Sequence, residues 1–112
     1  MRQCAILCVL WLVSAVGAVA QQLPSSENAL NYQACLTVQA QDLDDHISDA
    51  RTIASAASIS CVEQRAKEIA ERLSVPPESA RKMALDQRSD DTDRALIVVL
   101  RERIKRRASE KK

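Results

Sequence analysis

Glycine and aromatic residues are nearly absent from this chain of 112 residues, which has no phenylalanine, one glycine, one tryptophan and one tyrosine. The glycine and the tryptophan lie in the first twenty residues, so Tyr32 is the only aromatic residue beyond them. A glycine-rich loop that cradles a phosphate is therefore excluded there. A row of aromatic side chains on which nucleic-acid bases could stack is excluded as well. We expect the ring of Tyr32 in the core and its hydroxyl at the surface.

Histidine is equally scarce, because His46 is the only one. A hydrolytic triad needs a nucleophile and an orienting group that the fold places around the histidine, and no spacing in the chain indicates either. A lone histidine in a polar segment is usually solvated. We therefore expect a protein that is not an enzyme and that uses no cofactor.

The first twenty residues are typical of a secretory signal peptide. Arg2 gives a positive start, residues 4–20 are largely apolar, and Ala18-Val19-Ala20 matches the small-residue cleavage pattern before Gln21. An uncleaved anchor helix is the alternative, but a run of this length is short for a membrane span. We expect a signal peptide at 1–20, export to the periplasm or beyond, and no integral membrane segment after its removal.

Two of the four cysteines, Cys35 and Cys61, lie beyond this leader. Exported proteins meet an oxidising compartment, where such a pair is more often joined than free. Two cysteines alone do not complete a tetrahedral metal site. The sequence therefore predicts a disulfide between Cys35 and Cys61.

Helix-forming sequence fills the rest of the chain. After a polar lead-in at 21–26, caps, prolines and apolar spacing predict helices over 27–43, 48–73 and 77–87, and a fourth from a cap at 89–93 to residue 107. We expect an all-α fold of about four helices, with one domain at 27–107 and a basic tail at 108–112. The first two helices would form an α-hairpin stapled by the disulfide.

The apolar face of the predicted helix 48–73 shifts half-way along. Ile53 and Ala57 lie on one face, whereas Ile69 lies roughly 150° round from them at 100° per residue. Either a continuous helix serves two different cores with its two halves, or the helix breaks near 58–60, where serines can bend it. We prefer the continuous helix.

The run at 96–100 is the most hydrophobic part of the chain after the leader. It could form a strand on its own, but the caps before it and the basic residues after it favour a helix. Helical spacing predicts that Val98 points outward. The residues expected to face the core are Leu96, Val99, Leu100 and Ile104, with Ile97 beside them.

A cluster of acidic residues separates the first two predicted helices. Its carboxylates make weak candidates for a calcium site, since the segment lacks the glycine and the bidentate glutamate of an EF-hand loop. Short acidic side chains also bond to nearby backbone N–H groups in turns. We favour a turn with Ser48 as the cap of the next helix, and we assign no metal site. The weak candidates are Asp42, Asp44, Asp45 and Asp49.

Charge is distributed unevenly along the chain. Residues 21–50 contain five acidic residues and no lysine or arginine, whereas residues 101–112 contain seven basic residues. Such end-to-end polarity argues against a dedicated nucleic-acid-binding protein. Cations at a helix C-terminus are favoured by the helix dipole, so we expect a solvated, partly frayed helix end.

The segment from Cys35 through Leu43-Asp44-Asp45 and Ser48-Asp49-Ala50 to Cys61 resembles a group of uncharacterised small exported bacterial proteins, mostly alphaproteobacterial. The resemblance covers roughly residues 32–62 and implies an exported helical domain with paired cysteines. It carries no activity and no site residues. Such proteins commonly have glycine at the position of His46, and the departure suggests that this turn does not strictly need a left-handed residue.

The sequence thus favours an exported, non-catalytic helical module of the cell envelope that has an interaction or structural role, with a protein partner that it does not name. One alternative is a stress or chaperone-like protein that binds other proteins through apolar helix faces. Another is a weak metal-binding protein that uses the Asp42–Asp49 turn.

Overall fold

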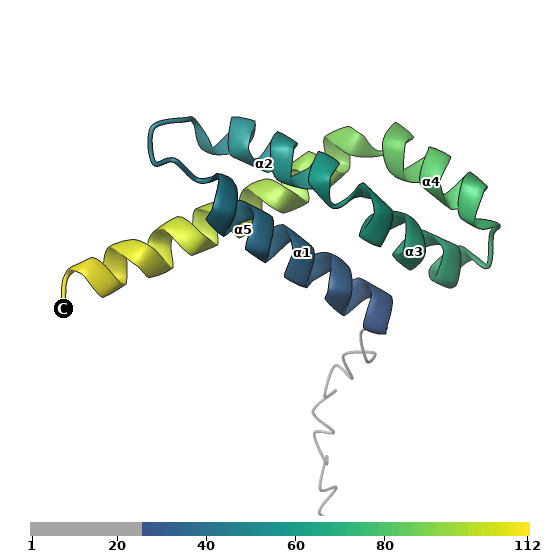
Figure 1. Ribbon diagram of the computed structural model, residues 1–112, viewed down its shortest axis with the longest axis horizontal. Coiled ribbons are helices and arrows are strands. Elements are labelled where there is room, and N and C mark those ends of the chain that lie inside the picture. The colour runs from purple at the N-terminus through teal and green to yellow at the C-terminus, as the bar shows by residue number, and fades with distance from the viewer. Residues whose placement is uncertain (1–25) are drawn as a thin grey trace, which may run out of the picture.

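The computed structural model describes residues 26–112, and this part of the chain folds into helices without strands (Figure 1). The predicted all-α class is confirmed, with five helices in place of about four. In chain order these are α1 Glu27–Leu43, α2 Ala50–Ser60, α3 Val62–Leu73, α4 Pro77–Asp86 and α5 Arg88–Glu110. The predicted signal peptide at 1–20 and nearly all of the lead-in lie outside the described residues. None of the described helices combines the length and apolarity that a membrane span requires.

The helix ends follow from local sequence. The hydroxyl of Ser26 accepts a hydrogen bond from the N–H of Ala29 at 3.2 Å, which caps α1. At the C-terminal end of α3, Ser74 adopts a left-handed conformation with φ 51° and ends the helix. Pro77 then opens α4 at the position where a missing N–H costs nothing.

The predicted helix 48–73 is not continuous, so that preference was wrong. Cys61, with φ −102° and ψ 14°, separates α2 from α3 (Figure 1). The hydroxyl of Ser58 donates back to the carbonyl of Ser55 at 2.9 Å, which is the kind of bond that bends a helix. The break lets the two apolar faces, which point in different directions, each reach a core.

Two apolar clusters result. The larger one is built from α1, α2 and α5 and includes Leu36, Ile53 and Val99. The smaller one lies between α3 and α4 and includes Ile69 and Ala84. The prediction that Ile53 and Ile69 serve different cores is therefore confirmed.

The face of α5 that enters the core differs from the predicted one. Val98 is buried with Val99, whereas Ile97, Leu100 and Ile104 are exposed. The buried residues of α5 are Asp91, Ala95, Val98 and Val99, and the acidic Asp91 escaped an argument based on apolar residues alone. The cap predicted at 89–93 was also wrong. These residues lie in the first turns of α5, and Gln87 alone separates α4 from α5.

The disulfide between Cys35 and Cys61 is present, as predicted. It joins the middle of α1 to the break between α2 and α3, with Cα atoms 5.9 Å apart. Because the larger cluster contains Cys61 and the smaller one begins directly after it, the disulfide stands between the two cores.

Candidate functional site

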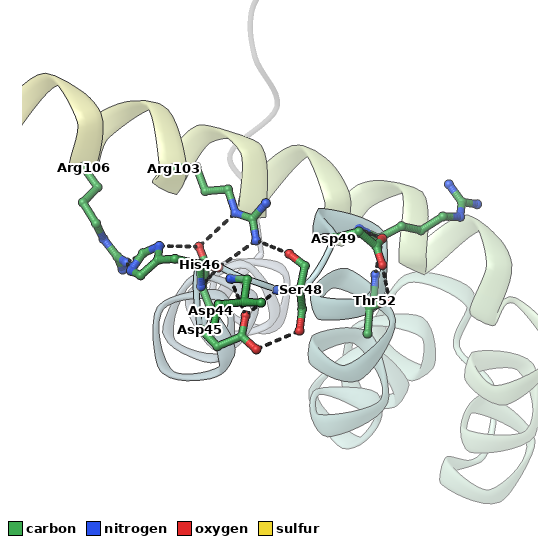
Figure 2. Close-up of polar contacts among 10 residues, drawn as sticks. Asp44, Asp45, His46, Ser48, Asp49, Thr52, Arg103 and Arg106 are labelled. Carbon is green, nitrogen blue, oxygen red and sulfur yellow. Dashed lines mark hydrogen bonds and ion pairs between the residues drawn. The ribbon is translucent and has the colours of Figure 1, made fainter.

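The turn between α1 and α2 is held against the C-terminal half of α5 by Arg103 (Figure 2). The guanidinium of Arg103 donates to both carboxylate oxygens of Asp44, with Nη2 2.7 Å from Oδ1 and Nε 3.0 Å from Oδ2. The same Nη2 donates to the carbonyl of Ser48 at 2.9 Å. Such a bidentate pair fixes direction as well as distance. The turn is thus tied to a residue 59 positions further along the chain.

Asp44 is the most perturbed carboxylate of this turn. Its side chain is only 3% exposed. Hydrogen bonds from Arg103 lower the pKa of Asp44 from 3.8 to about 2, against the opposing effect of burial, and the N–H of His46 adds to the lowering. Asp44 therefore serves as a permanent anion that receives Arg103.

The other acids of the turn act on the backbone. Asp45 accepts from the N–H groups of Ile47 and Ser48, and these bonds lower its pKa. Asp49, and not Ser48 as predicted, caps α2 by accepting from the N–H of Thr52 and from its hydroxyl. The interpretation of this segment as turn and cap chemistry is confirmed.

The weak metal candidates do not gather around a common point. Asp42 is exposed on the last turn of α1, Asp44 faces Arg103, and Asp45 and Asp49 bond to their own turns. Within residues 26–112, no group of three or more histidine, cysteine, aspartate or glutamate side chains is arranged to hold a metal ion.

His46 occupies the tip of the turn in a left-handed conformation, with φ 62°. The suggestion that the turn does not need such a residue was wrong. The N–H of His46 donates to Asp44 and its ring contacts the guanidinium of Arg106 on α5 (Figure 2). Glycine, which the resembling proteins commonly have here, adopts this conformation without steric cost.

We expect His46→Gly to be more stable than His46→Ala. Both variants lose the contact with Arg106, but only glycine avoids the clash of a Cβ atom in the left-handed region, which amounts to about 1 kcal/mol. Urea unfolding of the two variants measures the difference directly. Equal free energies of unfolding would show that the turn relaxes when the ring is removed.

A second expectation concerns pH. The ordinary pKa of Asp44 is 3.8 and its folded value is about 2, so its carboxylate stabilises the fold fully above pH 3.8. This contribution is lost as the pH falls from about 4 to about 2. Asp44→Asn should lose about 1.5 kcal/mol near pH 6, at the low end for a hydrogen bond to a charged group. Its free energy of unfolding should also fall less steeply below pH 4.

The control for this experiment is Asp42→Asn, since Asp42 lies two residues away and is exposed. Its stability curve should follow that of the wild type between pH 6 and pH 2. If Asp44→Asn also follows the wild-type curve, the pair with Arg103 contributes nothing to folding.

The basic end of α5 does more than extend into solvent. Arg103 and Arg106 contact the turn, so the expectation of a solvated end fails for them, and α5 remains helical to Glu110. A cavity of about 300 Å³ lies between them and is also lined by His46, Arg107 and Glu110. Arg103 is neutralised by Asp44 and Glu110 adds a carboxylate, so the cavity is not a dedicated anion site.

A buried ionic cluster, which sequence reasoning missed, joins the two cores. Arg65 on α3 and Asp91 on α5 are each 3% exposed, and Nε of Arg65 donates to Oδ1 of Asp91 at 3.0 Å. Arg65 also donates to Glu68 at 2.7 Å and to Gln87 at 3.3 Å. Burial raises the pKa of Asp91 even though the charge of Arg65 opposes this. Both Arg65 and Asp91 stand among other charged residues of their helices, as residues on a solvated helix face do. Nothing in the sequence therefore singled out this pair.

Tyr32 closes this cluster from α1. The guanidinium carbon of Arg65 lies 5.5 Å from the centre of its ring, within the range of a cation–π contact. Its hydroxyl is buried and has no hydrogen-bond partner, so the prediction of a surface hydroxyl was wrong. Burial, with Asp91 nearby, raises the pKa of Tyr32 to about 12.

Apolar side chains lie exposed on the outer face of α5. We call Ile97, Leu100 and Ile104 the α5 stripe; they are 59%, 46% and 67% exposed. They lie on the opposite side of the helix from the buried Ala95 and Val98. On α1, Leu30 and Val38 are also exposed, away from the buried face of that helix. These two surfaces are available for contact with another protein.

Comparison of the chain with protein-family models, curated proteins and solved structures finds no match.

Proposed function

We propose that the protein is an exported, non-catalytic helical module of the cell envelope that acts by binding another protein chain. The α5 stripe carries this proposal. Three large aliphatic side chains in a row on one helix, each about half exposed or more, are unusual for a small domain unless the face is covered by a partner. Exposed apolar residues scattered singly would need no such explanation.

The polar clusters support a structural and not a catalytic role. Asp44 is committed to Arg103, and Asp91 is committed to Arg65. The lowered pKa of Asp44 keeps this carboxylate charged near neutral pH, so it is poorly suited to take up or release protons there. These groups instead position α5 against the turn and against α3.

Export to the periplasm or the exterior is supported by the disulfide, which persists in oxidising compartments. The apolar leader at 1–20 agrees with this location. Protein isolated from its native compartment should begin at Gln21 and contain no thiol that can be alkylated. An intact mass that includes the leader, or two reactive thiols, would contradict export.

Binding is tested by a photo-crosslinking amino acid placed at Ile97 on the α5 stripe in living cells. Lys82, which is exposed on α4, is the matched control position. We expect one or a few discrete protein adducts from position 97 and none from position 82. If position 97 gives no protein adduct and Val38 on α1 gives none either, the proposed function is wrong.

A further inference from the structure

We propose that the partner of the α5 stripe is a second copy of this chain, paired with the first through antiparallel contact of the two α5 helices. This inference rests on the proposed function and names the partner. It would make the protein a two-fold symmetric dimer with the same surface used by both copies.

The spacing of the stripe is that of a helix that pairs with another helix. Asp93, Ile97, Leu100, Ile104 and Arg107 follow one another at intervals of four, three, four and three residues. This alternation keeps the five residues on one face of the helix, here called the seam, so that they can lie along a partner helix. The seam is apolar in the middle and charged at both ends.

The charges at the two ends select the orientation. Asp90 and Asp93 lie at the start of the seam, whereas Arg107 and Lys111 lie at its end. A two-fold axis near Leu100 places Asp93 of one copy beside Arg107 of the other, since both are seven positions from Leu100. Asp93 is exposed and also accepts from Arg51 of its own chain at 3.0 Å. Parallel pairing would bring acid to acid and base to base, which is unfavourable.

The same axis matches the apolar residues. Ile97 of one copy comes beside Ile104 of the other, and the two Leu100 side chains meet near the centre. Antiparallel helices also place the positive end of each dipole near the negative end of its neighbour. The charges and the apolar residues of the stripe therefore both favour antiparallel pairing.

The fold leaves room for this contact. The helices α1 and α2 pack on the buried side of α5, and its C-terminal end extends away from them (Figure 1). With 23 residues, α5 is about 34 Å long at 1.5 Å per residue. A second α5 can therefore lie along the stripe over about two heptads.

Three aliphatic side chains from each copy make a small interface, of the size found in weak complexes. We expect a dissociation constant on the order of 10–100 µM for the purified protein. Sedimentation velocity from about 5 to about 500 µM should show the shift from monomer to dimer.

The variant that tests the stripe is Leu100→Glu, and Leu85→Glu is its matched control. Leu85 lies on α4, is 43% exposed and is not on the seam. We expect Leu100→Glu to remain monomeric over the whole range with unchanged helicity and unfolding midpoint. Leu85→Glu should dimerise like the wild type.

Orientation is tested by charge reversal. Asp93→Lys and Arg107→Glu should each weaken the dimer about tenfold, and the double variant should restore it, since the two positions face each other across an antiparallel pair. Absence of rescue by the double variant would overturn the antiparallel arrangement. A wild-type protein that remains monomeric at 500 µM would overturn self-pairing altogether.

The two proposals fail in different ways. If the purified protein is monomeric but position 97 still crosslinks to a different protein in cells, the binding function holds and the identity of the partner is wrong. If position 97 yields only an adduct of twice the mass of the chain, both are supported. If neither experiment shows a contact, both are wrong.

Discussion

Asp91→Ala should lower the free energy of unfolding by about 3 kcal/mol, because it removes the charge that faces the buried guanidinium of Arg65. The side chains of both residues are almost fully buried, at 4% and 5% exposure. Glu68 still accepts from Arg65 at 2.7 Å in the variant, which keeps the loss at the lower end for a broken buried pair. Urea unfolding near pH 7 measures the change.

The matched control is Asp93→Ala, two residues further along α5. Asp93 accepts from Arg51 at 3.0 Å, the same distance as in the buried pair, but the side chains of both residues are more than 60% exposed. An exposed pair contributes about 0–1 kcal/mol, because water screens the charges and the side chains lose entropy. Similar losses for the two variants would show that burial does not matter here.

A double variant keeps the experiment informative if Asp91→Ala does not fold. Arg65→Met with Asp91→Leu replaces both charges by apolar side chains, which in other buried pairs has been neutral or stabilising. We expect it to be more stable than Asp91→Ala. If the double variant is less stable, the ionic cluster contributes more than its desolvation removes.

Much of the fold could be predicted from local signals in the sequence. Ser26, the Pro76-Pro77 pair and the residues around the acidic turn set helix ends through bonds to their immediate neighbours. The disulfide was predicted from two cysteines and from the expectation that the protein is exported. Such features depend on residues that lie close together in the chain, so their chemistry is visible without the tertiary structure.

The parts that the sequence did not predict depend on contacts between distant residues. Asp91 can be buried because it pairs with Arg65, which lies 26 positions earlier in the chain. An argument from apolar spacing treats Asp91 as solvated and then rotates α5 toward Leu100 and Ile104. The buried acid and the exposed stripe are therefore two consequences of one pairing that hydrophobicity cannot reveal.

The candidate surfaces illustrate the same division. The bonds of Asp45 to the backbone of its own turn could be predicted from the local sequence. The pair of Asp44 with Arg103 could not, because it joins residues 59 positions apart. The left-handed conformation of His46 could not be predicted, because histidine does not indicate positive φ as glycine would. Only the fold shows that the basic end of α5 supports the turn.

Reduction of the Cys35–Cys61 disulfide should lower the free energy of unfolding by about 3.5 kcal/mol, which is the loop-entropy value for a separation of 26 residues. Loss of this size is a large part of the total stability of a small domain. Urea unfolding with and without a reducing agent measures it. The matched control is Cys35→Ala with Cys61→Ala, whose stability should not respond to the reducing agent.

The position of the disulfide also predicts where the loss appears first. Cys61 lies at the break between α2 and α3, and the small cluster between α3 and α4 is joined to the rest largely through α1, Arg65 and this bond. We therefore expect amide hydrogens around Ile69 to exchange faster after reduction, while those around Ile53, in the larger cluster, change less. Equal acceleration in both clusters would mean that the domain opens as one unit. Unchanged stability and exchange after complete reduction would show that the disulfide does not hold the two cores together.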